Sequence, residues 1–133
     1  MIDVMGLLKE KTETQEITSK AGKALTKRNC KLVDFDEDGN GFVEIEMTFW
    51  GKQCELIEDV EKDEVIMIKG ARTSNFHDHS LSSAYGSKVI KKLEQRFPPA
   101  QKLFEAWKNH EEGNDMNIKT LTQGDYFFSF FFL

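Results

Sequence analysis

The alternation of apolar and polar side chains between residues 42 and 49 constrains the fold of this chain more than any other feature. The apolar side chains fall mostly on one side of a period of two, while Glu44, Glu46 and Thr48 fall on the other. Residues 36–41, just before this stretch, combine three acids with two glycines and an asparagine, which is a dense turn signal. A looser alternation precedes the turn. The segment therefore predicts a β-hairpin whose second strand keeps one face in water.

The rest of the chain supplies further strands and two helices. Residues 53–60 place Leu56, Ile57 and Val60 at helical spacing, and residues 98–107 begin with two prolines and then show one apolar face. Besides the strand described above, we predict strands at residues 3–18, 29–35, 65–68 and 81–90, the first of them extended or bent. Five strands, a short helix between the third and the fourth, and a C-terminal helix predict an all-β protein, a small closed barrel of the OB type.

The length limits the chain to one folded domain with a tail. With 133 residues, of which 39% are hydrophobic and 31% charged, the chain can bury one core. We predict an OB domain over residues 1–110 and a tail or linker over residues 111–133. This last part is polar and then ends in a phenylalanine-rich run, to which the barrel plan assigns no place.

Positive charge is concentrated in one segment of an acidic chain. The formal net charge is −5, yet residues 19–31 hold five cations and no acid, and Lys20, Lys23, Lys27 and Arg28 are four of these cations. The segment contains a glycine and shows neither helical nor strand periodicity, which predicts a loop, or a loop leading into the next strand. A positive strip on an acidic body differs from the uniformly basic character of a histone or a ribosomal protein.

Cysteine use and hydropathy favour a cytosolic or nuclear protein. Cys30 and Cys54 form no C-x-x-C pattern, and we interpret them as reduced, buried thiols. The longest apolar run, residues 127–133, is far shorter than the roughly 20 residues that span a bilayer. The first residues do not resemble a signal peptide. We therefore expect no membrane segment and no membrane partner.

Two aromatic residues have no obvious core to fill. Trp50 closes the alternating strand, and Phe76 lies in the polar loop after residues 65–68. Single-stranded nucleic acid exposes a charged backbone and unpaired base faces, so a protein that binds it needs spaced cations and solvent-facing rings. This chain offers both, on neighbouring elements.

Residues 25–90 resemble a DNA-binding OB domain of the large subunit of replication protein A. The segments that carry the resemblance are residues 27–29 (Lys-Arg-Asn), 48–51 (Thr-Phe-Trp-Gly), 69–76 (Lys-Gly-Ala-Arg-x-Ser-x-Phe) and 80–82 (Ser-Leu-Ser). Their order and spacing match together. The chain departs from the family after the loop aromatic, where His77, Asp78 and His79 replace small glycines and an arginine.

The resemblance implies a nuclear, non-catalytic module that binds single-stranded DNA in replication, repair or telomere maintenance. It implies that Trp50 and Phe76 stack on bases and that Arg72 touches the backbone or base edges. It also implies that cations of the loop between the first two strands, here Lys20, Lys23, Lys27 and Arg28, close over the DNA. The implied partners are single-stranded DNA and other OB domains of the same chain or complex.

A competing motif lies in the hairpin turn. Residues 36–43 resemble the first positions of a calcium-binding EF-hand loop, with Asp36, Asp38 and Asn40 as ligands. The twelfth position needs a bidentate glutamate and holds Met47, and the flanks alternate with period two where helices are required. We therefore favour an acidic hairpin turn and keep calcium binding as a lesser alternative.

Enzymatic and metal functions find little support in the residue pattern. His77, His79 and His110, taken with the cysteines, lack the spacing of a structural zinc site. No nucleophile with a neighbouring base, no phosphate loop and no convergent pair of carboxylates can be recognised. We expect no enzyme activity and no cofactor. The main alternative to DNA binding is an OB module that binds another protein.

Overall fold

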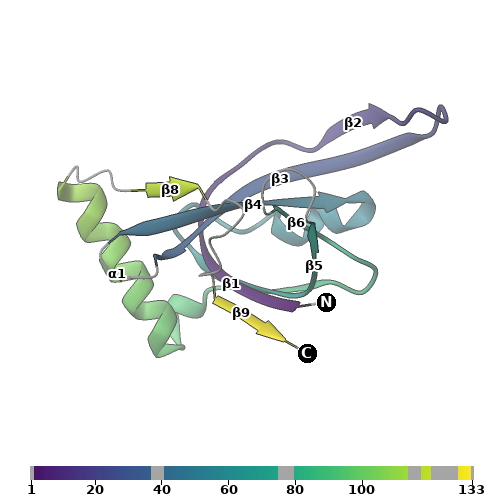
Figure 1. Cartoon of the computed structure of the whole chain (residues 1–133). Coiled ribbons are helices and arrows are strands. Elements are labelled where there is room, and N and C mark those ends of the chain that lie inside the picture. Colours follow the sequence, from purple (N-terminus) through teal and green to yellow (C-terminus); the bar gives the residue numbers. More distant parts are fainter. Residues whose placement is uncertain (1, 37–40, 75–79, 114–117, 121–128, 133) are drawn as a thin grey trace.

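Strands dominate the computed structural model, which describes residues 2–36, 41–74, 80–113, 118–120 and 129–132 (Figure 1). The strands are β1 (Ile2–Lys11), β2 (Gln15–Thr18), β3 (Ala24–Phe35), β4 (Phe42–Trp50), β5 (Val65–Ser74), β6 (Ser80–Ser82), β7 (Lys88–Ile90), β8 (Ile118–Thr120) and β9 (Ser129–Phe132). The helices are η1 (Gly51–Ile57) and η2 (Leu93–Gln95), both of the 3-10 type, and α1 (Pro98–Gly113).

The strands close into a barrel. β1 pairs with β3 on one side and with β5 on the other, β3 pairs with β4, and β6 joins β4 to β5. The fifth strand position is shared by β6 and β7, because β7 continues the pairing with β5. The predicted five-stranded OB barrel is therefore confirmed, with η1 as the short helix after the third strand position and α1 as the C-terminal helix.

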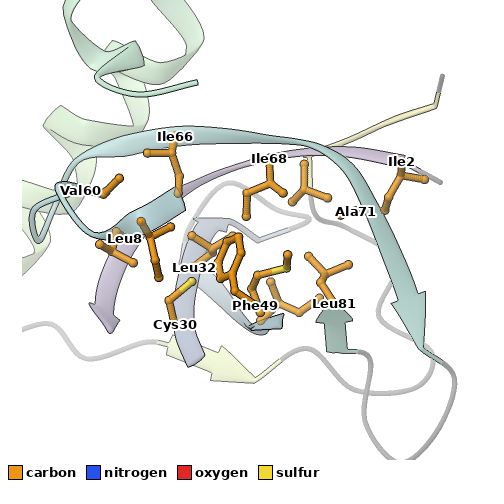
Figure 2. Packing of buried hydrophobic residues seen from close by; sticks show 14 of the residues in the cluster. Ile2, Leu8, Cys30, Leu32, Phe49, Val60, Ile66, Ile68, Ala71 and Leu81 are labelled. Atoms are coloured by element: carbon orange, nitrogen blue, oxygen red, sulfur yellow. The ribbon is translucent and has the colours of Figure 1, made fainter. Parts of the chain in front are cut away.

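The barrel interior is filled by the apolar side of each strand. Along β4, Met47 and Phe49 are fully buried while Thr48 between them is not, as the period of two predicts. Figure 2 shows Phe49 of β4 in one buried cluster with Leu32 of β3 and Ile68 of β5. Burial of such side chains contributes roughly 1.5–3 kcal/mol each, which makes this cluster the main source of stability.

The two cysteines belong to this interior, as predicted. Cys30 on β3 and Cys54 on η1 are both free and buried. Burial, with a smaller effect of the Glu46 carboxylate, raises the pKa of the Cys30 thiol to about 12. The thiol therefore stays protonated and unreactive in the folded protein.

Helix α1 covers a second apolar cluster outside the barrel. Trp107 packs edge-on against Phe42 with ring centroids 5.1 Å apart, and the indole nitrogen donates to the Asp63 carboxylate at 3.1 Å. Val33 and Leu103 are buried in the same cluster. The helix begins at Pro98, where a missing N–H is tolerated, so the predicted helix start is confirmed.

Two local predictions need correction. The basic segment 19–31 is a loop leading into the next strand, one of the two predicted alternatives, but the strand begins earlier than the predicted residue 29. β3 begins at Ala24, because β2 pairs with it from Gln15↔Lys27 to Thr18↔Ala24. The loop is reduced to the turn between these strands. Residues 81–90 were predicted as one strand, but β6 and β7 are separated by a turn closed by a hydrogen bond from the Ser87 N–H to the Ala84 carbonyl, 3.0 Å.

Residues beyond α1 also contribute strands. β8 pairs in parallel with the first residues of β4, with Phe42 opposite Ile118. β9, from the phenylalanine-rich end, pairs antiparallel with β1, with Ile2 opposite Phe132. The end of the chain thus has a place at the barrel edge, whereas the division at residue 110 stays a prediction. Within the described residues, no helix combines the length and the apolar character needed to cross a membrane.

Candidate nucleic-acid interface

Trp50 lies at the end of β4 on the outer side of the barrel. Because side chains alternate along a strand, Phe49 points inward and is fully buried, while Trp50 is 38% exposed. The backbone N–H of Trp50 donates to Ser83 Oγ at 3.0 Å, which holds the end of β4 against the turn after β6. The ring is therefore presented from a fixed strand end.

Lys27 shares this face with Trp50. The two residues are direct partners in the β3–β4 ladder, and Asn29 and Thr48 form the next pair with the same orientation. Side chains that lie opposite each other in an antiparallel pair project to the same side. A cation and an exposed aromatic ring are thus neighbours on two adjacent strands.

Arg72 is brought to the same face by the sheet register. It is exposed on β5 and is paired with Ser82 on β6, and Ser82 is paired with Thr48 on β4. Thr48 lies two residues before Trp50 and therefore shares its side of the strand. Arg72, Lys27 and Trp50, which the sequence places far apart, consequently border one surface across four strands.

Lys20 and Lys23 occupy the turn at the tip of the β2–β3 arm. Both are exposed, and the backbone N–H of Lys23 donates to Ser19 Oγ at 3.1 Å. Figure 1 shows this arm extending beyond the barrel. The four residue-to-residue steps from Lys23 to Lys27 span about 13 Å of extended chain at about 3.3 Å each, so Lys20 and Lys23 form an outer group of cations.

Arg28 faces the protein in this structure. It lies opposite Phe49 in the ladder and is 4% exposed. Its Nε donates to the Thr12 carbonyl at 2.8 Å, and its guanidinium forms an ion pair with Glu58. The side chain therefore ties β3 to the β1–β2 connection and to the residue after η1. Its predicted contact with DNA stays a prediction.

Phe76 lies outside the described residues, as do His77 and His79 in the same loop. Asp38 and Asn40, two of the candidate calcium ligands, also fall outside them. The described flanks of that turn are β3 and β4, where an EF-hand has helices. The part of the chain that the structure covers contains no group of three or more potential metal ligands.

The outer face of β3 and β4 becomes acidic away from Trp50. Glu46 is exposed opposite Lys31, and Glu44 forms an ion pair with Lys9 at 2.7 Å. A hydrogen bond from Lys31 to the Glu10 carboxylate raises the pKa of that lysine. The sequence predicts that this face is exposed to water, but its negative charge was not recognised as a feature of the face. The positions of Glu44 and Glu46 in the alternating pattern indicate that charge.

A polar row between Arg72 and Lys27 was also missed by sequence reasoning. It consists of Asn29, Thr48 and Ser82, which the ladders place side by side on the outer face. Asn29 Oδ1 is buried and has no hydrogen-bond partner. Hydroxyl and amide groups of this kind can donate to or accept from base edges. Only the register of the strands brings these three residues together.

A cavity of about 440 Å³ lies beside η2 and α1. Its lining includes Asp63, Glu94 and Phe104. The carboxylates are engaged within the protein, since Glu94 accepts the Val65 N–H at 2.8 Å and Asp63 accepts from Trp107. We therefore assign this cavity to the packing of the helices on the barrel.

Comparisons with known proteins agree with the fold described above. The profile of the family Replication protein A OB domain matches residues 1–92. The replication protein A 70 kDa DNA-binding subunit of Danio rerio is 32% identical over 123 residues, covering 92% of this chain and 19% of the relative. Replication factor A protein 1 of Saccharomyces cerevisiae is 32% identical over 122 residues, covering 92% of this chain and 18% of the relative.

Solved structures show the same similarity. A replication protein A heterotrimer bound to single-stranded DNA contains a chain that superimposes with a TM-score of 0.71 and 28% identity, covering 92% of this chain and 27% of the other. A replication factor A related protein from Methanobacterium thermoautotrophicum shares the fold with a TM-score of 0.53 at 18% identity. The chain therefore spans about a fifth of the length of the curated relatives that it matches.

Proposed function

This chain belongs to the replication protein A OB domain family, and we propose that it binds single-stranded DNA without catalysing a reaction on it. One observation carries the proposal. The register of the barrel gathers the exposed ring of Trp50, the cation Lys27 and the cation Arg72 on one outer face. In OB folds this strand face, with the loops that flank it, binds oligonucleotides.

Stacking supplies most of the affinity in this mechanism. The Trp50 indole lies flat against one base, and Phe76 contributes a second ring from the loop after β5. Each stacked base contributes about 1–3 kcal/mol, and this contribution tolerates any sequence because every base has a π-face. No bond is made or broken, so the residues need only shape and charge.

Cations hold the DNA backbone beside these rings. Lys27 is placed next to Trp50 to meet a phosphate, and Arg72 approaches from β5. Lys20 and Lys23, at the tip of the arm, contact the backbone where it leaves the barrel face. Arg28 acts as a positioning residue, because its bonds to Thr12 and Glu58 set the base of the arm. Each phosphate contact makes binding more sensitive to salt.

The domain acts as one module of a longer protein. One OB fold covers only about 4–16 nucleotides, so further OB domains of the same chain or complex bind the same strand and gain through effective concentration. We place this activity in the nucleus, in DNA replication and repair. A role at telomeres would require base selectivity, and the polar row around Asn29 and Ser82 would supply it.

The double substitution Trp50→Ala with Phe76→Ala tests the proposal. We expect binding of a mixed-sequence oligonucleotide, measured by fluorescence anisotropy, to weaken by at least about 30-fold, because two stacked bases lose roughly 2 kcal/mol or more. Glu105→Ala, on the exposed outer side of α1, is the matched control and should bind normally. Undiminished binding by the double variant would contradict the stacking mechanism.

Binding of another protein is the second candidate. The acidic half of the same face favours it, because Glu46 is exposed there and its carboxylate repels a phosphate backbone. In that case the wild-type domain would fail to bind any oligonucleotide at low salt. A panel of oligonucleotides of differing composition, titrated at two salt concentrations, separates the two functions and also reports base preference.

A further inference from the structure

Tyr85 is the second large apolar side chain that the described part of the chain exposes. It is 100% exposed, compared with 38% for Trp50. The fold removes none of the Tyr85 side chain from water, so this ring does not stabilise the fold by packing. Its exposure alone would need no explanation. The turn that carries Tyr85 and the charged residues near it suggest a reason for this exposure.

Hydrogen bonds hold the turn that presents Tyr85. The Ser87 N–H donates to the Ala84 carbonyl, and Gly86, with a φ of +84°, occupies the third position, as a type II turn requires. Ser87 Oγ accepts the Ala84 N–H at 2.8 Å and donates to the Gly70 carbonyl on β5 at 2.9 Å. A fully exposed ring therefore stands on a turn that is fastened to the barrel.

The same turn is fastened beside Trp50. In Figure 1 β6 lies next to β4, and the N–H of Ser83, just after β6, donates to the Thr48 carbonyl at 2.8 Å. Ser83 Oγ accepts the Trp50 N–H, and Gln53 Nε2 donates to the Ala84 carbonyl. Tyr85 is two residues from Ser83, at most about 7 Å of chain, so its backbone lies close to the residue that accepts the Trp50 N–H.

Two lysines lie side by side just after this turn and on the strand that pairs with it. Lys88 on β7 and Lys69 on β5 are direct partners in the ladder, and both are exposed. Like charges directly opposite each other destabilise a sheet. The Asp3 carboxylate, 3.7 Å from Lys69, offsets this repulsion only partly. A phosphate between the two ammonium groups would remove it.

We propose that Tyr85, Lys69 and Lys88 form a second contact subsite for the same single strand, in which Tyr85 stacks on a base beyond the one at Trp50 and the lysines hold the following phosphate. The subsite lengthens the stretch of DNA that one barrel covers. The proposal rests on the proposed function, since a strand that never reaches Trp50 cannot continue to Tyr85.

Tyr85→Ala, measured with oligonucleotides of increasing length, tests the stacking part. We expect the variant to match the wild type on the shortest oligonucleotide that binds and to weaken binding of longer ones roughly 5- to 150-fold. Tyr85→Phe is the control, because it keeps the ring and should bind normally. Both variants should fold normally by circular dichroism, because the side chain is fully exposed. Trp50→Ala, measured in parallel, should lose affinity at every length.

Lys88→Gln tests the phosphate part. The slope of log binding constant against log salt concentration should become shallower by about 0.7, the value for one phosphate contact on a single strand. Lys102→Gln, on the exposed side of α1, is the charge-matched control and should leave the slope unchanged.

The outcomes separate the subsite from the proposed function. If Trp50→Ala loses binding while Tyr85→Ala and Lys88→Gln behave like the wild type at every length, the subsite is wrong and DNA binding stands. If Tyr85→Phe weakens binding as much as Tyr85→Ala does, the hydroxyl and not the ring makes the contact, and the stacking is wrong. If the wild-type domain binds no oligonucleotide, both proposals fall.

Discussion

Two adjacent cations on β3 have opposite surroundings, and this predicts opposite effects of mutation. Lys27 lies on the outer face beside Trp50, whereas Arg28 is buried and bonded to Thr12 and Glu58. Arg28→Ala should lower the free energy of unfolding by roughly 1.5–3 kcal/mol, because hydrogen bonds to a charged group are lost, and urea denaturation measures this. Lys27→Ala should leave the free energy of unfolding nearly unchanged and make the salt dependence of DNA binding shallower by about 0.7. The reverse pattern would show that Arg28 and not Lys27 contacts the DNA backbone.

The outer face of strand β4 has an aromatic, polar half, which we propose contacts DNA, and a half with two glutamates. Trp50 and Thr48 belong to the first, and Glu46 and Glu44 to the second. Glu46→Lys should therefore strengthen oligonucleotide binding about fivefold at about 0.1 M salt, because one repelling charge is removed and one phosphate contact is gained. Isothermal titration calorimetry at two salt concentrations measures the effect. Glu105→Lys on α1 makes the same change of net charge away from this face. Equal strengthening by both variants would mean that only the net charge matters and that the face has no special role.

The proposed binding of DNA to the folded barrel predicts that DNA protects its two buried thiols from labelling. Cys30 and Cys54 are buried, and burial raises the pKa of Cys30 to about 12, so neither reacts with a thiol reagent until the barrel opens. Single-stranded DNA that binds only the folded barrel should slow labelling by a factor of 1 plus the ratio of DNA concentration to Kd, about 100-fold at 100 Kd. Labelling of the wild type followed by mass spectrometry measures this, with the Trp50→Ala and Phe76→Ala double variant as the unprotected control. Full-rate labelling at saturating DNA would show that the DNA binds without stabilising the barrel.

The raised pKa of Cys30 also makes the stability of the barrel depend on pH. The unfolded thiol ionises near its usual pKa of 9.0, while the folded one stays protonated to about pH 12. The contribution of the protonated Cys30 thiol to the free energy of unfolding is fully present below pH 9. It is lost progressively as the pH rises from about 9 to about 12. Urea denaturation at pH 8 and pH 10 should show a loss of stability that Cys30→Ala reduces. An identical loss in the variant would place the cause in other groups.

Much of the fold could be read from local patterns. The period of two in residues 42–49 required a strand with Met47 and Phe49 inside and Thr48 outside, because a strand turns successive side chains to opposite faces. The apolar face after Pro98 and Pro99 required a helix that packs on something apolar. The order of five strands, a short helix and a C-terminal helix was sufficient to predict the OB barrel. Each of these signals is carried by residues close together in the chain.

Pairing between distant strands decided the rest. Nothing local distinguishes Lys27 from Arg28, and only the ladder with β4 sends one outward beside Trp50 and the other inward beside Phe49. The basic segment became strand because β2 offers it a partner, which no periodicity within the segment records. Ser83 lies beside Trp50 through hydrogen bonds to β4, and Arg72 shares the outer face through the ladders of β5, β6 and β4. A sequence encodes which side chains prefer water, but which of them meet depends on the register, and the register is a property of the folded chain.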